Sequence, residues 1–179
     1  MFDAKILPPS KLNQQFVLRP LHLDDYNLGF AKVLAMLTDI EGLNCATFKE
    51  TYLKLETAKN YFVVVIEDTK KHLIVAAGTL LVEQKFIHNA GKIGHIEDIV
   101  SHSEYRGMNL GRAVIEALIA VSRHNKCYKT ILDCSEKNVL YDLFRLNFTR
   151  NSALCAKRLR CLCILTRPNF DYLTPQGKK

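Results

Sequence analysis

The sequence predicts a mixed α/β fold: a twisted, mostly antiparallel sheet flanked by helices, with a β–α–β unit near its centre. Residues 61–68, 73–88 and 94–100 are rich in β-branched and aromatic side chains, and the turns between them are too short for parallel crossovers. Residues 110–124 repeat apolar side chains at helical spacing and lead directly into an apolar strand at 128–134. A helix that separates two strands in this way usually makes them parallel neighbours.

The beginning of the chain adds a strand and a helix to this core. A double proline in residues 1–15 predicts an extended arm. Residues 16–21 have the pattern of a first strand, with a proline near its end. Asp24 and Asp25 then predict a helix start, and apolar side chains recur at helical spacing over 26–37.

A second helix is expected over 46–57. Thr47 and Glu50 have the spacing of a capping box, which predicts Thr47 as the cap. Gly78 interrupts the long second strand of the meander and indicates a bulge or a kink.

The last part of the chain completes a single domain at 16–159. A short helix is expected at 139–146 and a final regular strand at 153–159. Residues 160–179 are interpreted as a C-terminal extension, in which 162–165 either adds a strand or packs on a partner. No repeat, low-complexity tract or interior linker divides the 179 residues.

Charge and cysteine usage narrow the class of protein. The net charge of +7 favours an anionic partner, which is a nucleic acid, a membrane surface or a phosphorylated small molecule. The six cysteines form no C-x-x-C pair, so reduced thiols in a cytoplasmic protein are expected. No uncharged apolar run of about 18 residues occurs, and the start lacks the pattern of a secretory signal.

A glycine-containing loop precedes the helix of 110–124. Arg106, Gly107 and Gly111 lie where a polar connector turns into that helix. A helix start presents unpaired N–H groups and positive dipole, glycine lets the backbone approach a phosphate, and a cation adds charge-assisted contacts. The sequence therefore predicts a phosphate-binding loop, with an ordinary helix start as the alternative. The patterns G-x-x-x-x-G-K-[ST] and G-x-G-x-x-G are both absent.

The order of these motifs resembles the GNAT superfamily of N-acetyltransferases. The resemblance rests on the meander, on EDIV and RGMNLG, and on an Asn-Val pair near a tyrosine. The segments KFIH, GHIED and DCSEKNV are similar, within that superfamily, to members that acetylate D-glucosamine 6-phosphate. The likeness covers about residues 16–158. It implies a GNAT fold and transfer of an acetyl group to the sugar's 2-amino group, an early step toward UDP-N-acetylglucosamine.

The resemblance also implies acetyl-CoA as the cosubstrate and no metal. The pyrophosphate would lie on the loop and helix start, and the strand at 98–100 would splay from its neighbour to offer main-chain groups to the pantetheine and the thioester oxygen. The residues implied in coenzyme binding are Asp98, Ile99, Val100, Arg106, Gly107, Met108, Asn109, Leu110, Gly111, Arg112, Asn138 and Tyr141.

Four residues are implied in catalysis. The resemblance places Glu97, Asp98 and Asp133 at the sugar, where they would orient the amine and receive its proton; strand-end carboxylates facing solvent are the alternative. Tyr141 would protonate the leaving thiolate. It stands one residue earlier than in the family, a rotation of about 100° in a helix, and Asp142 occupies the family's tyrosine position. The role of Tyr141 therefore stays open.

Four cationic side chains are implied in binding the sugar phosphate. They are Arg19, Lys85, His88 and Arg158, the last of which matches a residue that reaches across a homodimer interface in the family. Three of them have a plain alternative: a first-strand arginine that snorkels for Arg19, a turn histidine for His88, and a solvated edge for Arg158. The phosphate site requires that these residues converge.

Other functions stay open beside acetylation of the phosphosugar. The acceptor could be a protein amine or a polyamine, or the altered segment NVLYDLFRLNF could mark a GNAT-fold protein with impaired catalysis. A basic nucleic-acid-binding module is disfavoured, because Lys and Arg are spread along the chain without a recognition motif. We expect a cytoplasmic homodimer that acts on a small molecule, without nucleic acid.

Overall fold

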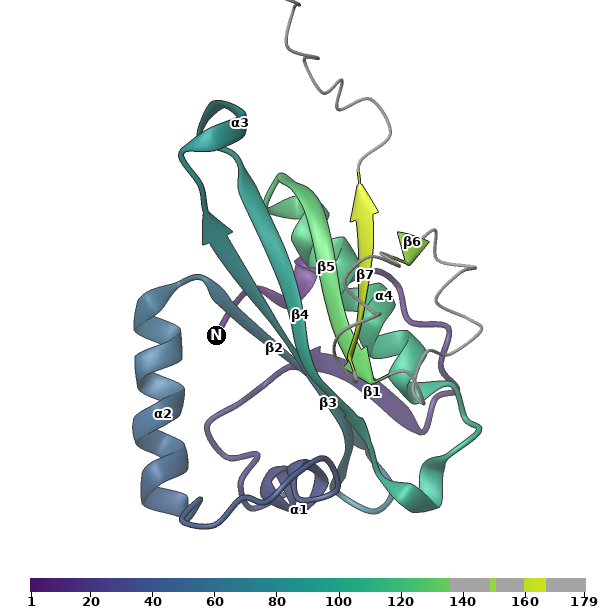
Figure 1. Ribbon diagram of the computed structural model, residues 1–179. Helices are drawn as coiled ribbons and strands as arrows, with labels where there is room; N and C mark the ends of the chain where they lie inside the picture. Colours follow the sequence, from purple (N-terminus) through teal and green to yellow (C-terminus); the bar gives the residue numbers. More distant parts are fainter. Residues whose placement is uncertain (136–148, 151–159, 167–179) are drawn as a thin grey trace, which may run out of the picture.

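One mixed sheet organises the molecule. The computed structural model describes residues 1–135, 149–150 and 160–166, with side chains through residue 132. Seven strands in this part of the chain form a sheet in the order β1-β2-β3-β4-β5-β7-β6 (Figure 1). Helices pack on both of its faces. The predicted fold class is thereby confirmed.

The first four strands form the antiparallel part of the sheet. They are β1 Phe16–Pro20, β2 Tyr61–Asp68, β3 Leu73–Gln84 and β4 Lys92–Ser101. Each pairs antiparallel with the next, as the short turns predict. The central side chains of β2, Val64, Val65 and Ile66, are fully buried, which confirms a strand enclosed on both faces.

The far edge of the sheet contains one parallel pair. β5, Cys127–Ser135, runs parallel to β4, which confirms the β–α–β unit. On its other side β5 pairs antiparallel with β7, Arg160–Thr166, and β7 pairs with β6, Thr149–Arg150. Of the two alternatives left open for 162–165, the structure shows the first, because β7 adds a strand to the sheet. Outside the described residues lie the helix and strand predicted at 139–146 and 153–159.

Two apolar layers cover the sheet. On one face lies α4, Leu110–His124, with the bounds predicted from the sequence. Its predicted stripe is at most 1% exposed: Leu110, Val114, Leu118 and Val121. The N-terminal arm packs against this layer and includes one turn of 3-10 helix, η1, Ala4–Ile6. On the other face lie α1, Phe30–Leu34, and α2, Cys45–Ala58.

The helix predicted over 26–37 is much shorter in the structure. Gly29 precedes α1 at φ 86°, in the left-handed region, and residues 23–29 form turns instead of a helix. Asp25 does not start a helix, because its carboxylate pairs with Arg19 and accepts a hydrogen bond from the His22 N–H (2.7 Å). A tertiary ion pair thus replaces the local capping that the sequence suggested.

The cap of α2 also differs from the prediction. Asn44 is the N-cap, and its side-chain oxygen accepts a hydrogen bond from the Thr47 N–H (3.0 Å). Thr47 therefore lies inside the first turn. Asn and Thr are both good caps, so the sequence located the helix but not the residue that starts it.

Candidate active site

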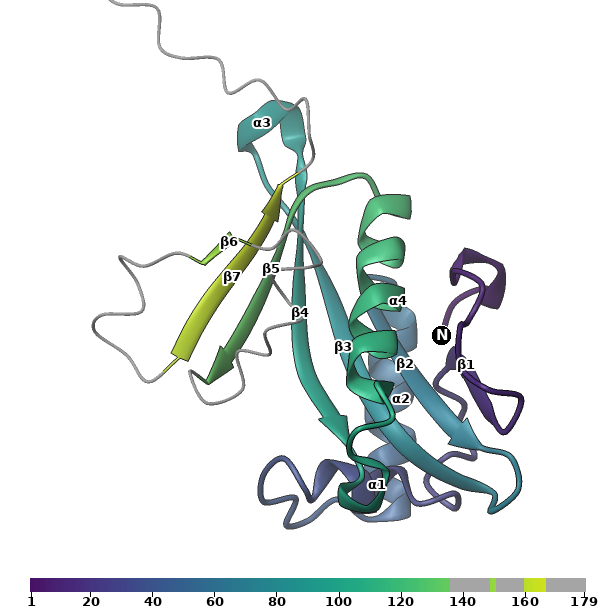
Figure 2. The ribbon, with the colours of Figure 1, turned by 90° about the vertical axis from the view of Figure 1, so that its right-hand side faces the viewer.

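β4 and β5 separate at the middle of the sheet. The last residue pair that joins them is Ile96 with Leu132, although β4 continues to Ser101 and β5 to Ser135. Figure 2 shows the two strands diverging toward their carboxyl ends. In the part of the chain that the structure describes, residues 97–101 pair with β3 alone. The splay predicted at 98–100 is present.

A β-bulge marks the start of this separation. Thr79 pairs with Glu97 and Ala77 with Val100, so Asp98 and Ile99 together oppose the single residue Gly78. Asp98 has φ 55°, and the side chains of Glu97 and Asp98 are exposed. A Cβ on Gly78 would lie 2.5 Å from Ile99 Cδ1 and 2.6 Å from Val114 Cγ1. The side chain of Ile99, in the bulge, therefore fills the space that a Cβ on residue 78 would need. The bulge predicted at Gly78 is confirmed.

We expect Gly78→Ala to destabilise the protein and to disturb the separated strands. The added Cβ would have to displace buried atoms of Ile99 and Val114, and overpacking of this kind costs about 1–3 kcal/mol. Urea unfolding measures the loss. Ile99→Val removes the Cδ1 atom and should reduce the penalty when combined with Gly78→Ala. Equal penalties in the two backgrounds would contradict the steric explanation.

The start of α4 lies beside the separated strands (Figure 2). The short 3-10 helix η2, Ser103–Tyr105, leads from β4 into a loop in which Gly107 has φ 81° and Asn109 has φ 59°. Asn109 is the N-cap but makes no side-chain cap hydrogen bond. The amides of Leu110 and Gly111 precede the bond from the Ala113 N–H to the Asn109 carbonyl (3.0 Å). The helix start can therefore donate to an anion.

Open space accompanies these amides. A Cβ placed on Gly107 or on Gly111 would meet no atom of the described residues within 4 Å. Arg106, Gly107, Met108 and Asn109 are all exposed. The predicted coenzyme-binding residues from Arg106 to Arg112 thus form one loop and helix turn, accessible except at the buried Leu110, next to Asp98, Ile99 and Val100 on β4.

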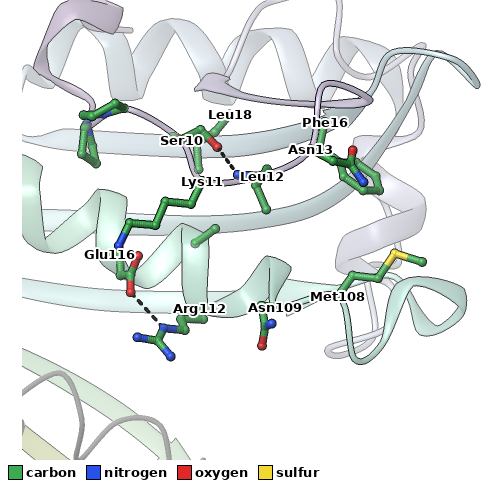
Figure 3. A pocket seen from close by; sticks show the side chains of 13 residues that line it. Ser10, Lys11, Leu12, Asn13, Phe16, Leu18, Met108, Asn109, Arg112 and Glu116 are labelled. Atoms are coloured by element: carbon green, nitrogen blue, oxygen red, sulfur yellow. Dashed lines mark hydrogen bonds and ion pairs between the residues drawn. The ribbon is translucent and has the colours of Figure 1, made fainter.

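A separate cavity lies on the β1 side of α4. It has a volume of about 490 Å³ and lies between the N-terminal arm and the first turns of the helix (Figure 3). Its lining includes Met108, Asn109, Arg112 and Glu116. Arg112 Nε donates to Glu116 Oε1 (2.9 Å), and Figure 3 shows Lys11 extending toward the same carboxylate. The cavity thus touches the loop at Met108 and Asn109, on the side of α4 that faces the N-terminal arm and away from the separated strands.

The structure does not support Arg19 as a phosphate ligand. Its guanidinium donates to both carboxylate oxygens of Asp25 (2.8 Å each) and to Glu67 Oε2 (2.8 and 3.0 Å). Burial acts to lower the pKa of Arg19, but the hydrogen bonds that it donates to Asp25 and Glu67 outweigh it and raise the pKa. The side chain is 13% exposed. Arg19 is therefore held as a structural cation in this fold, and its role as a substrate-binding residue stays a prediction.

Lys85 and His88 lie at the tip of the β3–β4 hairpin, around the left-handed turn α3, Ile87–Ala90. Lys85 Nζ pairs with Glu83, and the His88 ring packs on Tyr128 with centroids 4.4 Å apart. Lys92, at the base of this tip, precedes Asp98 by six residues, which is about 20 Å along a strand. Within one chain these two residues therefore do not meet Glu97 and Asp98.

The remaining predicted residues are only partly described. Asp133 belongs to β5 beyond the last pair with β4, on the other strand of the separation from Glu97. Asn138, Tyr141 and Arg158 lie outside the described residues. Among residues that the structure does describe, no three His, Cys, Asp or Glu side chains gather as metal ligands. No helix in the same residues is long and apolar enough to cross a bilayer.

Sequence reasoning missed two residues beside the loop, Asp68 and Tyr105. The Tyr105 hydroxyl donates to Asp68 Oδ2 (2.8 Å), and both side chains are buried. The only sequence signal is the position of Tyr105 immediately before Arg106. Asp68 is 37 residues away and has no local pattern that points to the loop.

The separated strands, the bulge and the open helix start are the arrangement of an acetyltransferase. Residues 31–148 match the family model described as "Acetyltransferase (GNAT) family". The chain belongs to this family, whose members use acetyl-CoA as cosubstrate.

Several similar proteins are named for one more specific activity, as glucosamine 6-phosphate N-acetyltransferases. The protein of that name from Dictyostelium discoideum is 44% identical over 124 residues, covering 69% of this chain and 78% of the relative. The one from Candida albicans is 36% identical over 128 residues, covering 72% and 86%. The crystal structure of the Arabidopsis thaliana enzyme has a TM-score of 0.69 and 34% identity, covering 75% of this chain and 90% of the other.

Proposed function

We propose that this protein transfers the acetyl group of acetyl-CoA to the 2-amino group of D-glucosamine 6-phosphate. The observation that carries the donor site is the junction where β4 leaves β5 next to the glycine-containing start of α4. The acceptor is inferred from the relatives, which are named for this sugar phosphate and match most of the chain.

The described residues fit the coenzyme. Donors at a helix start and the glycines Gly107 and Gly111 suit a diphosphate, because no Cβ fills the space beside them. Arg106 and Arg112 add cationic charge near that position. Residues 97–101, which lack β5 as a neighbour, suit an extended amide-bearing chain such as pantetheine. When bound, acetyl-CoA supplies an activated thioester carbonyl for a free amine.

On the acceptor side, the protein contributes carboxylates at the separation. Glu97 and Asp98 are exposed where the strands diverge, within reach of solvent. A carboxylate there can orient an ammonium group and take up the proton that the amine releases, directly or through water. Main-chain donors at 99–100 that face developing negative charge would stabilise the transition state more than the ground state.

We infer that the protein acts as a homodimer. Within one chain, Lys85 and His88 are remote from Glu97, so a second copy is a natural source of cations for the sugar phosphate. The hairpin tip also exposes apolar surface, since Phe86 is fully exposed and Ile87 is 61% exposed. Light scattering at micromolar concentration tests this, and a monomer that is fully active would overturn it.

The acceptor is tested by direct assay. Purified protein is mixed with acetyl-CoA and glucosamine 6-phosphate, unphosphorylated glucosamine, spermidine or a histone peptide, and free thiol is followed. We expect turnover with the phosphosugar and little with the others. Preference for spermidine or the peptide would replace the acceptor, and coenzyme binding without any turnover would indicate an impaired catalyst.

A further inference from the structure

The loop from Arg106 to Asn109 is held from its two ends. All four of its residues are exposed, whereas Tyr105 before it is 4% exposed and Leu110 after it is 1% exposed. Leu110 is the first residue of α4 and belongs to its apolar stripe, so its position is fixed by the packing of the helix. The position of the loop's first half therefore depends on how firmly Tyr105 is fixed.

Tyr105 is fixed by one buried carboxylate. Its hydroxyl donates to Asp68 Oδ2 at 2.8 Å, and its ring packs edge-on against Phe16 with centroids 5.9 Å apart. Lys71 Nζ lies 5.2 Å from the centre of the same ring. A tyrosine in this setting cannot turn away without breaking polar and apolar contacts together.

Asp68 connects three segments that are distant in the sequence. The same oxygen that receives the Tyr105 hydroxyl accepts from Gln15 Nε2 (2.8 Å), which comes from the N-terminal arm. The other oxygen accepts from the Lys70 and Lys71 N–H groups (3.0 and 3.2 Å), which form the β2–β3 turn. The side chain is 0% exposed, so each of these donors stabilises a charge without access to water.

The charge states of this pair suit a permanent link. Burial acts to raise the pKa of Asp68, but hydrogen bonds from Tyr105, Gln15, Lys71 and Lys70 outweigh it and lower the pKa. Burial, followed by the hydrogen bond to Asp68, raises the pKa of Tyr105. Near neutral pH the tyrosine therefore remains the donor and the aspartate the acceptor.

We propose that Asp68 and Tyr105 are positioning residues that hold the loop Arg106–Asn109 in the geometry that receives the diphosphate of the donor. The proposal rests on the proposed function, because it concerns how the coenzyme is bound. Neither side chain needs to touch the coenzyme, since both are buried behind the loop. Their contribution is to keep the amides and the cation of the loop arranged before binding.

The test compares a donor that has a diphosphate with one that lacks it. Tyr105→Phe keeps the ring and removes the hydroxyl. We expect its KM for acetyl-CoA to rise about tenfold with kcat within about twofold, as for a lost charge-assisted hydrogen bond. Turnover of S-acetylpantetheine, measured as kcat/KM, should stay within about twofold of wild type. Asp68→Asn should likewise raise the KM for acetyl-CoA and leave kcat/KM for S-acetylpantetheine nearly unchanged.

Tyr52→Phe is the matched control. It removes the hydroxyl of another buried tyrosine, on α2 at the opposite face of the sheet, and should leave both donors unaffected. Equal losses with both donors in Tyr105→Phe would show a general effect on the fold and overturn the proposal, as would unchanged kinetics with acetyl-CoA. If calorimetry finds no binding of coenzyme A to the wild-type protein, the proposed function itself fails. Binding by wild type that equals binding by Tyr105→Phe overturns the positioning role alone.

Discussion

Gly111→Glu is expected to remove activity with acetyl-CoA while leaving the protein folded. Gly111 is the second residue of α4, and a Cβ there meets no atom of the described part of the chain within 4 Å. The new side chain would extend into open space and place a carboxylate where the diphosphate is proposed to bind. Juxtaposed like charges cost several kcal/mol, so kcat/KM for acetyl-CoA should fall by about 100-fold or more.

Stability should move in the opposite direction. Glutamate has a higher helix propensity than glycine, and a negative charge in the first turn interacts favourably with the helix dipole. The melting temperature of Gly111→Glu should therefore equal or exceed that of wild type. Gly111→Ala separates the two effects, because it adds the Cβ without the charge and should lose much less activity. A Gly111→Glu protein with normal kcat/KM would show that the coenzyme does not use this helix start.

The elements that the sequence predicted most closely depend on local pattern. The bounds of the helix at 110–124 match the prediction, because its apolar stripe and the glycine-containing loop before it are read from neighbouring positions. The meander and the bulge at Gly78 were likewise anticipated, since short turns and an isolated glycine in a strand have few structural alternatives. The phosphate-binding loop follows from the same local information.

The errors arise where residues distant in the sequence compete for one side chain. The sequence predicts Asp25 as the start of a helix, but in the fold its carboxylate accepts hydrogen bonds from Arg19 and from the His22 amide. Asp68 showed no pattern at all, because its partners come from the arm, its own turn and Tyr105. Such contacts are decided by the tertiary arrangement of the sheet. A single sequence without that arrangement cannot assign them.

This competition also bears on why the described members of the predicted cation set, Arg19, Lys85 and His88, do not converge on Glu97 within one chain. A basic side chain can bind a phosphate only with charge that neighbouring carboxylates have not already neutralised. Arg19 has Asp25 and Glu67, and Lys85 has Glu83. Lys85 can exchange Glu83 for a phosphate, because both members of its pair are more than 30% exposed and exposed ion pairs are weak. Arg19 is bound to a buried carboxylate, so we expect its removal to affect stability.

Arg19→Ala is expected to lower the free energy of unfolding by about 3–5 kcal/mol, the usual effect of removing one partner of a buried ion pair. Asp25 is 1% exposed and would remain as a buried carboxylate without its bidentate partner. Urea unfolding measures the change. In contrast, Lys54→Ala breaks an exposed pair with Glu50 and should cost no more than about 0.5 kcal/mol.

A double-mutant cycle distinguishes the structural role of Arg19 from the phosphate-binding role first expected. Asp25→Asn removes the buried charge, so Arg19→Ala should cost less in that background than in the wild type. At a temperature where Arg19→Ala is still folded, its KM for glucosamine 6-phosphate should match that of wild type, because the guanidinium is already occupied by Asp25 and Glu67. A selective rise in that KM, with stability unchanged, would return Arg19 to the substrate site. It would also mean that the two carboxylates release it when the sugar binds.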